Sequence, residues 1–378
     1  MKVALLTYST KPRGSVVHTW ELADALTALG HEVCIYALDK EGSGCDRPLT
    51  TPLHLIPAQP ALPNIDRLIQ QRIQEFVAAL ENVSDRHDIY HAQDCIGANA
   101  LLQLRERGLL PHVVRTVHHV EAYESLYLRE CQDKSIRLPD LCLCVSDRWQ
   151  KNLEDDFGLH APRVYNGVNL KRFSPQPSGQ EVALKTAYSL TGSPLYLTVG
   201  GIEPRKNSIR LLEAFAQVLT HRPTAQLIIA GGATLFDYQP YRDQFFQRAT
   251  DLRIPVGQSL VLPGVIPDAD LPSLYRCADV FCFPSTKEGW GLVVLEAIAS
   301  GLPVITSNQP PFTEFLRPDQ AFLVPPESSD RLANAMIQAT DLAQTQPFIH
   351  HSQSLLSQYT WEFSAQRHLQ LYQTLITP

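Results

Sequence analysis

Residues 279–297 read DVFCFPSTKEGWGLVVLEA, and this short window sets the architecture that the rest of the chain repeats. The apolar run Asp279–Phe283 predicts a buried parallel strand, and Leu292–Ser300, which glycine and proline follow, predicts a helix. Gly289 and Gly291 therefore fall between a strand and a helix, where the backbone can approach a ligand without a Cβ in the way. The unpaired amides of the first helical turn favour an anion there, and phosphate is the anion that we expect to bind.

Two glutamates add chemistry to this window. Glu296 lies about one turn into the predicted helix among apolar neighbours, where an ionised carboxylate is costly to bury unless a group hydrogen-bonds to it. A sugar or a ribose diol would do so. The alternative is that Glu296 complements the helix dipole and Glu288 is a solvated loop residue, and either glutamate alone leaves both interpretations open.

Alternation of strands and helices extends over the whole chain. Before residue 169 we predict strands at Lys2–Tyr8, Val33–Leu38, Asp88–Ala92, His112–Val117, Leu141–Val145 and Val164–Tyr165, with helices at Val16–Leu29, Ala98–Glu106 and from Ser146 or Asp147. After a linker at 169–180 we predict strands at Leu195–Val199, Gln226–Ala230, Leu260–Leu262, Val280–Phe283 and Val304–Thr306, with helices at Asn207–Leu219, Gln239–Arg253 and Ala269–Cys277. This pattern predicts an α/β fold of two Rossmann-like, doubly wound domains facing a central cleft.

Composition excludes several classes of protein. The 378 residues are 44% hydrophobic and 19% charged, which is typical of a globular protein with more than one domain. The net charge of −7 is spread over both halves, so a nucleic-acid partner is not expected. Most of the eight cysteines lie in apolar runs, and the apolar run Val3–Leu6 is too short for a signal peptide or a membrane span. We therefore expect a cytoplasmic protein with at most peripheral membrane contact.

A second loop, GGIEPRKN at residues 200–207, also follows a strand and precedes a helix. It is not the dinucleotide-binding pattern, which argues against a nicotinamide enzyme. Two glycines followed by Arg205 and Lys206 suit a diphosphate whose charge must be held while a bond breaks. By itself, an Arg-Lys pair before a helix is more often solvated surface charge.

The two motifs together resemble the retaining GT-B-type glycosyltransferases of glycosyltransferase family 4, also called glycosyl transferases group 1. The resemblance rests on E-x7-E with an internal G-x-G at 288–296 and on G-G-x-x-x-x-K-N at 200–207. It implies an acceptor domain at 1–175, a nucleotide-sugar donor domain at 185–360, and a last helix at about 361–378 that crosses back onto the first domain. That helix is amphipathic, with Phe363, His368, Leu371 and Tyr372 predicted on one face.

The resemblance also implies roles for single residues. Glu288 lies beside the transferred sugar, Glu296 holds the ribose, and Arg205 and Lys206 with Gly201 meet the diphosphate. The remaining donor-site residues that it implies are Gly14, Val265, Ile266, Gly289, Trp290, Gly291 and Leu292. His118 ends a predicted strand and matches a histidine beside the donor sugar, although a lone strand-end histidine is more often structural.

The activity that the resemblance implies is transfer of a sugar from a nucleotide-diphospho-sugar to an acceptor hydroxyl, with retention of the anomeric configuration. The acceptor is open: a sugar, a lipid-linked glycan or a small molecule. We expect no cofactor and no metal, because Arg205, Lys206 and the helix amides can neutralise the diphosphate charge. We also expect no Asp-x-Asp cluster that could chelate a metal ion. The alternatives are a nucleotide-sugar epimerase and a catalytically silent sensor or scaffold; the presence of both glutamates and both cations argues against the silent protein.

Overall fold

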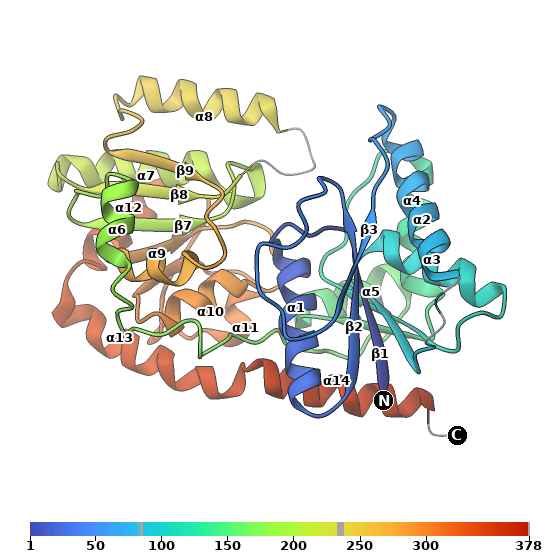
Figure 1. The fold of residues 1–378 in the computed structure, drawn as a ribbon. Coiled ribbons are helices and arrows are strands. Elements are labelled where there is room, and N and C mark those ends of the chain that lie inside the picture. Colours follow the sequence, from blue (N-terminus) through green and yellow to red (C-terminus); the bar gives the residue numbers. More distant parts are fainter. Residues whose placement is uncertain (82, 84–85, 233–237, 377–378) are drawn as a thin grey trace. The chain divides into compact units, whose positions relative to one another are not determined.

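The computed structural model describes residues 1–81, 83, 86–232 and 238–376, and the chain forms two compact units (Figure 1). Unit 1 comprises Met1–Gly167 and Tyr359–Pro378, and unit 2 comprises Val168–Gln358. Residues 377–378 of the predicted terminal helix lie outside the described residues. Each unit is built on one six-stranded parallel sheet with helices packed against it, so the predicted pair of Rossmann-like domains is confirmed.

The sheet of unit 1 has the order β3-β2-β1-β4-β5-β6. Its strands are β1 (Lys2–Thr7), β2 (Glu32–Asp39), β3 (Leu53–Pro57), β4 (Ile89–Ala92), β5 (Val113–Val117) and β6 (Leu141–Cys144). Its helices are α1 (Gly14–Ala28), α2 (Ile65–Glu81), α3 (Cys95–Glu106), α4 (Leu126–Arg137), α5 (Asp147–Phe157) and α14 (Trp361–Ile376). The central strands β4 and β5 are buried along their whole length, and β1 is buried from Val3 to Thr7, as the near-continuous apolar runs predict.

The sheet of unit 2 has the order β12-β11-β10-β7-β8-β9, which repeats the connectivity of unit 1. Its strands are β7 (Leu195–Val199), β8 (Gln226–Ala230), β9 (Leu260–Gly264), β10 (Val280–Phe283), β11 (Val304–Ser307) and β12 (Phe322–Val324). Its helices are α6 (Glu181–Ala187), η1 (Pro204–Lys206), α7 (Ser208–His221), α8 (Gln239–Asp251), α9 (Leu271–Cys277), α10 (Leu292–Ala299), α11 (Phe312–Phe315), α12 (Ser329–Gln338), α13 (Leu342–Leu355) and η2 (Leu356–Gln358).

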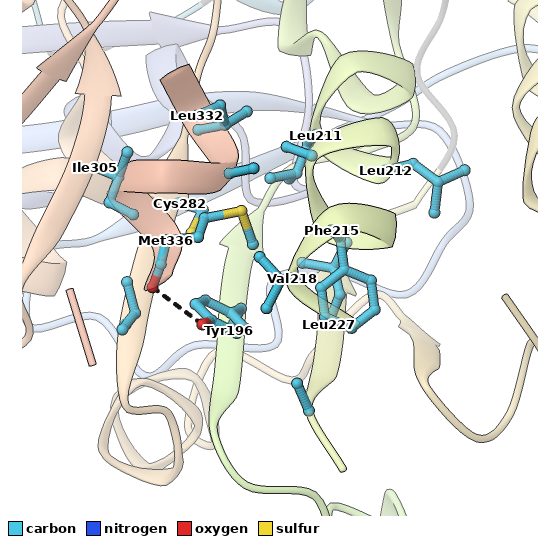
Figure 2. Packing of buried hydrophobic residues seen from close by; sticks show 14 of the residues in the cluster. Tyr196, Leu211, Leu212, Phe215, Val218, Leu227, Cys282, Ile305, Leu332 and Met336 are labelled. Atoms are coloured by element: carbon cyan, nitrogen blue, oxygen red, sulfur yellow. Dashed lines mark hydrogen bonds between the residues drawn. The ribbon is translucent and has the colours of Figure 1, made fainter. Parts of the chain in front are cut away.

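The core of unit 2 lies between its sheet and the helices α7 and α12 (Figure 2). Phe215 of α7 and Met336 of α12 are fully buried against strand residues such as Tyr196 and Cys282. The Tyr196 hydroxyl donates to the Met336 carbonyl at 3.0 Å, so the ring is buried while its hydroxyl keeps a hydrogen-bond partner. Each such side chain contributes about 1.5–3 kcal/mol by leaving water.

Some sequence predictions differ from the structure. The strand predicted at Val164–Tyr165 is wrong, since this segment makes only an isolated bridge between Arg163 and Cys144. Phe363 is half exposed and does not share the buried face of α14. The edge strand β3 and the helices α2 and α4 were not predicted; β3 has little burial, so its apolar signal is weak.

The segment predicted as a linker packs on unit 2. Arg172 pairs with Asp268 at 2.7 Å, and the Ser178 hydroxyl lies 3.0 Å from the Ser273 hydroxyl. The division between the units therefore falls at Gly167, ahead of the Pro- and Ser-containing stretch. A Cβ on Gly167 would lie 2.3 Å from the backbone of Thr360, so only glycine fits where this segment meets the start of α14.

Among the described residues, no helix combines the length and the apolar character needed to cross a membrane.

Candidate active site

In each unit the strand order reverses beside the first strand, and ligands of open α/β sheets bind at the carboxyl end of such a reversal. In unit 2 the reversal lies between β7 and β10, and the two loops predicted to hold the donor follow these strands. Backbone and hydroxyl contacts join the two loops: the Thr286 amide and the Ser285 hydroxyl both donate to the Arg205 carbonyl, at 2.8 Å and 2.7 Å.

The structure brings three predicted site residues together around one carboxylate oxygen. Oε1 of Glu288 accepts hydrogen bonds from Lys206 Nζ at 2.7 Å, Arg205 Nη1 at 3.0 Å and Ser285 Oγ at 2.7 Å. Arg205 also pairs through Nε with the buried carboxylate of Glu203 at 2.9 Å. The cations are thus held by carboxylates before any substrate arrives, which is preorganisation of charge at the strand-order reversal.

Burial and charge act in opposite directions within this cluster. Burial alone would raise the pKa of the Glu288 carboxyl, but Lys206 and Arg205 outweigh it and lower that pKa below its usual value. Burial lowers the pKa of the Lys206 ammonium, and Glu288 opposes the shift. Glu288 is therefore an ionised group that orients two cations.

Both cations keep donors available for a ligand. Within the described part of the chain, Lys206 gives one of its three N–H groups to Glu288, and Arg205 uses Nε and Nη1 of its guanidinium fork. The side chain of Arg205 is 38% exposed and that of Lys206 is 14% exposed. The unused donors can bind the oxygens of a diphosphate.

Glycines let the ends of β7 and β8 approach closely. A Cβ on Gly201 would lie 2.4 Å from the Gly232 carbonyl oxygen, and one on Gly231 would lie 2.4 Å from the backbone of Gly200. The stem of Lys206 passes over Gly200, where φ is +145°. The first glycine pair belongs to the predicted loop, whereas the second was not predicted, although Gly231 and Gly232 also directly follow a predicted strand.

The start of α10 is built for close approach. Gly291 has φ of +113°, and a Cβ there would lie 2.8 Å from the Phe312 ring, so this position requires glycine. The first turn of α10 contains no acidic side chain, so its amides retain their attraction for an anion. Gly289 and Leu292 flank this turn and are partly buried.

Trp290 lies in the same turn with a different environment. Its side chain is buried, and its ring centroid lies 4.9 Å from that of Phe315. The indole is therefore part of the packing beneath the turn, which leaves backbone groups as the way in which Trp290 could contact a donor.

Glu296 is buried on α10, and the Tyr275 hydroxyl donates to its Oε2 at 2.8 Å. Burial, followed by the nearby carboxylate, raises the pKa of Tyr275 well above its usual value, so the phenol remains a donor. Part of the hydrogen bonding that a buried carboxylate needs thus comes from the protein. Tyr275 lies on α9 and gave no sequence signal for this role.

The turn after β9 places its two predicted base contacts differently. Val265 is 62% exposed, and its Cγ2 would lie 2.6 Å from a Cβ on Gly232, so it is adjacent to the glycine pair. Ile266 is buried in the unit. Val265 is thus the side chain of this pair that a nucleotide base can reach.

Two predicted residues belong to unit 1. His118 follows β5, is 8% exposed, and its Nε2 lies 3.0 Å from Gln93 Oε1. Burial, followed by the neighbouring His18 and Arg115, lowers the pKa of His118 well below its usual value, so the ring is neutral at pH 7. A Cβ on Gly14, the first residue of α1, would meet nothing within 4 Å, so the protein's own packing does not demand glycine there.

The described residues contain no cluster of three His, Cys, Asp or Glu side chains arranged to hold a metal ion. The chain does carry an Asp-x-Asp sequence at Asp268–Asp270, so the prediction that it has no such cluster is wrong. Asp268 is buried and pairs with Arg172. This aspartate has a structural role in the unit.

Comparison with known protein families supports the assignment made from the motifs. A family model described as "Glycosyl transferases group 1" matches residues 185–346, and one described as "Glycosyltransferase Family 4" matches residues 12–172. The O-antigen chain mannosyltransferase B of Escherichia coli is 26% identical over 330 residues, which are 84% of this chain and 81% of the relative. The phosphatidyl-myo-inositol mannosyltransferase of Mycolicibacterium smegmatis is 25% identical over 387 residues, covering 96% of this chain and 91% of the relative.

Solved structures share the fold over the whole chain. HepE of Anabaena, solved with UDP and glucose, has a TM-score of 0.79 at 20% identity and covers 99% of this chain and 100% of its own. The sucrose-phosphate synthase of Thermosynechococcus elongatus has a TM-score of 0.80 at 22% identity and covers 99% and 98%. Both motifs, the doubled Rossmann-like fold and the two family matches agree. This chain therefore belongs to the GT-B glycosyltransferases of the family 4 type.

Proposed function

We propose that this glycosyltransferase moves a glycosyl unit from a nucleoside-diphosphate sugar to an acceptor hydroxyl and retains the anomeric configuration. The observation that carries the proposal is the pair of cations, Arg205 and Lys206, fixed by Glu288 at the strand-order reversal of unit 2. A fixed pair of cations with unused donors matches the charge of a departing diphosphate.

The leaving group sets the demands on the site. When the bond between the sugar and the diphosphate breaks, negative charge grows on the phosphate oxygens, and Lys206, Arg205 and the amides at the start of α10 lie on the loops that can meet it. We propose that no divalent cation is needed. The acceptor attacks the same face of an oxocarbenium-like sugar, and its proton passes to the departing phosphate oxygen.

GDP-mannose is our first choice of donor. Relatives that match most of this chain are named as mannosyltransferases, and a further relative from Corynebacterium glutamicum is named as GDP-mannose-dependent. Structural neighbours have been solved with UDP and with UDP-glucose, so UDP-glucose is the alternative donor. The acceptor is a hydroxyl of a sugar, of a lipid-linked glycan or of a small molecule.

The test begins with binding and ends with the product. We expect GDP-mannose or UDP-glucose to raise the unfolding temperature, since a ligand at ~100 times its Kd adds ~2.7 kcal/mol to the folded state. Release of nucleoside diphosphate is then measured with a panel of acceptors, with and without EDTA, and proton NMR reads the anomeric configuration of the first product. Lys206→Ala should abolish most turnover, whereas Lys185→Ala, an exposed lysine of the same unit, should not.

Each alternative has its own outcome in this experiment. Epimerised sugar without transfer would indicate an epimerase, and binding without turnover across the panel would indicate a sensor. An inverted linkage would refute retention. Activity that EDTA abolishes and that magnesium or manganese restores would refute the metal-independent mechanism.

A further inference from the structure

A row of buried polar side chains in unit 1 leads from the terminal helix to His118. His91 lies on β4, and Gln93 comes two residues later, directly after the strand. Thr116 likewise lies on β5, and His118 comes two residues later, directly after that strand. Residues two apart on a strand share a face of the sheet. Tyr372 of α14 reaches this face, and the five side chains are at least nine-tenths buried.

Hydrogen bonds join these groups in one order. Tyr372 Oη lies 2.6 Å from His91 Nδ1, His91 Nε2 lies 3.2 Å from Gln93 Nε2, and Gln93 Oε1 lies 3.0 Å from His118 Nε2. Thr116 Oγ1 lies 2.8 Å from His91 Nε2. We call Tyr372, His91, Gln93 and His118 the hydrogen-bond chain.

In this structure the Gln93 amide directs its oxygen to His118 and its nitrogen to His91, and this orientation sets where the protons are. An amide oxygen only accepts, so His118 Nε2 must carry the hydrogen that it donates to Gln93. The amide nitrogen of Gln93 only donates, so His91 Nε2 must be bare and its Nδ1–H donates to Tyr372. The two histidines are therefore held as opposite neutral tautomers.

His118 then has one nitrogen left. Its Nδ1 carries a lone pair, and among the residues that the structure describes His118 has no second hydrogen-bond partner. His18 contacts its ring edge-on, with centroids 4.8 Å apart, which further restricts the ring. A neutral imidazole with a bare Nδ1 accepts hydrogen bonds from hydroxyl groups and cannot act as a cation.

We propose that Gln93, His91 and Tyr372 are positioning residues that hold His118 as its Nε2–H tautomer, so that Nδ1 accepts a hydrogen bond from a hydroxyl group of the transferred sugar. The sugar partner rests on the proposed function, whereas the tautomer rests on the chain of contacts alone. A change on α14, which follows unit 2 in the sequence, thereby acts on His118 through a series of hydrogen bonds.

NMR of the histidine-labelled protein tests the proton order without substrate. Nitrogen-15 shifts should show His118 with Nε2 protonated and Nδ1 bare, and His91 with the opposite pattern; His118→Gln assigns the first signal. Tyr372→Phe removes the acceptor for His91 Nδ1–H. His91 can then carry its hydrogen on Nε2 and the Gln93 amide can turn over, so His118 should become a mixture of tautomers. Tyr196→Phe, which deletes a buried tyrosine hydroxyl in unit 2, is the matched control and should leave the pattern unchanged. Reversed tautomers, or imidazolium at His118, would overturn the proposal.

A double-mutant cycle tests whether Gln93 acts through His118. Gln93→Leu should lower kcat/KM about tenfold, the usual effect of one hydrogen bond, while the affinity for free nucleoside diphosphate stays unchanged. In the His118→Ala background the same substitution should have little further effect. Equal losses in both backgrounds would overturn the proposal, and Tyr372→Phe carries the same cycle if Gln93→Leu does not fold. Absence of transfer by the unaltered protein would instead count against the proposed function, since the NMR result decides the proton order independently.

Discussion

Lys206→Ala should separate the structural and catalytic roles of the cation cluster. Lys206 Nζ lies 2.7 Å from Glu288 Oε1 and 4.3 Å from the centroid of the Phe283 ring. After the substitution Glu288 keeps Arg205 and Ser285, so the cost should be below the ~3–5 kcal/mol of breaking a buried ion pair outright. We expect about 2 kcal/mol, or a fall in Tm of roughly 4–8 °C for a unit of this size. The effect on turnover should be larger, about 10²–10³-fold in kcat, because the charge is needed most as the diphosphate leaves.

The assay measures kcat at saturating donor and Tm by calorimetry on the same preparations. Lys206→Arg keeps a positive charge and should recover part of kcat, whereas Lys185→Ala controls for loss of an exposed lysine in the same unit. A kcat of Lys206→Ala within about threefold of the unaltered protein would remove this residue from the leaving-group site and refute the reasoning.

Three further predictions follow from other parts of the structure. Glu296→Gln should weaken nucleoside diphosphate and intact donor alike, whereas Glu288→Gln should weaken the sugar-bearing donor more; calorimetry with both ligands decides, and unchanged nucleoside diphosphate affinity in Glu296→Gln would exclude the ribose role. Gly231→Ala should destabilise the fold strongly, since its Cβ would lie 2.4 Å from the backbone of Gly200, and an unchanged urea midpoint would contradict this packing. Burial lowers the pKa of His368 to about 4 and depresses the pKa of three other buried histidines (His18, His91 and His118), so the unfolded chain binds protons that the folded chain does not. The free energy of unfolding should therefore be unaffected by these histidines above about pH 6.5 and should fall as the pH drops from there, by up to ~1.4 kcal/mol per pH unit for each histidine. Urea unfolding at a series of falling pH values measures this, and His368→Gln should make the pH dependence shallower.

Sequence alone was enough for the elements whose signal is local. The strands β7, β8 and β10 begin and end where the apolar runs do, because buried parallel strands need apolar side chains on both faces and the flanking glycines and prolines end them. The same punctuation located the two loops that bear Arg205, Lys206 and Glu288. The spacing of the motif residues then indicated what the burial pattern could not, namely the kind of ligand that such loops bind.

The tertiary structure decided which of these groups touch. Lys206 and Glu288 are 82 residues apart, and their contact exists because β7 and β10 are neighbours at the reversal of strand order. Tyr372 meets His91 across 281 residues, and Tyr275 reaches Glu296 from another helix. A local pattern of apolar and polar residues specifies a strand or a helix but not its neighbours. The hydrogen-bond and ion-pair partners of each polar group are therefore set only when its own sheet assembles. These partners in turn set the charge and the protonation state of that group.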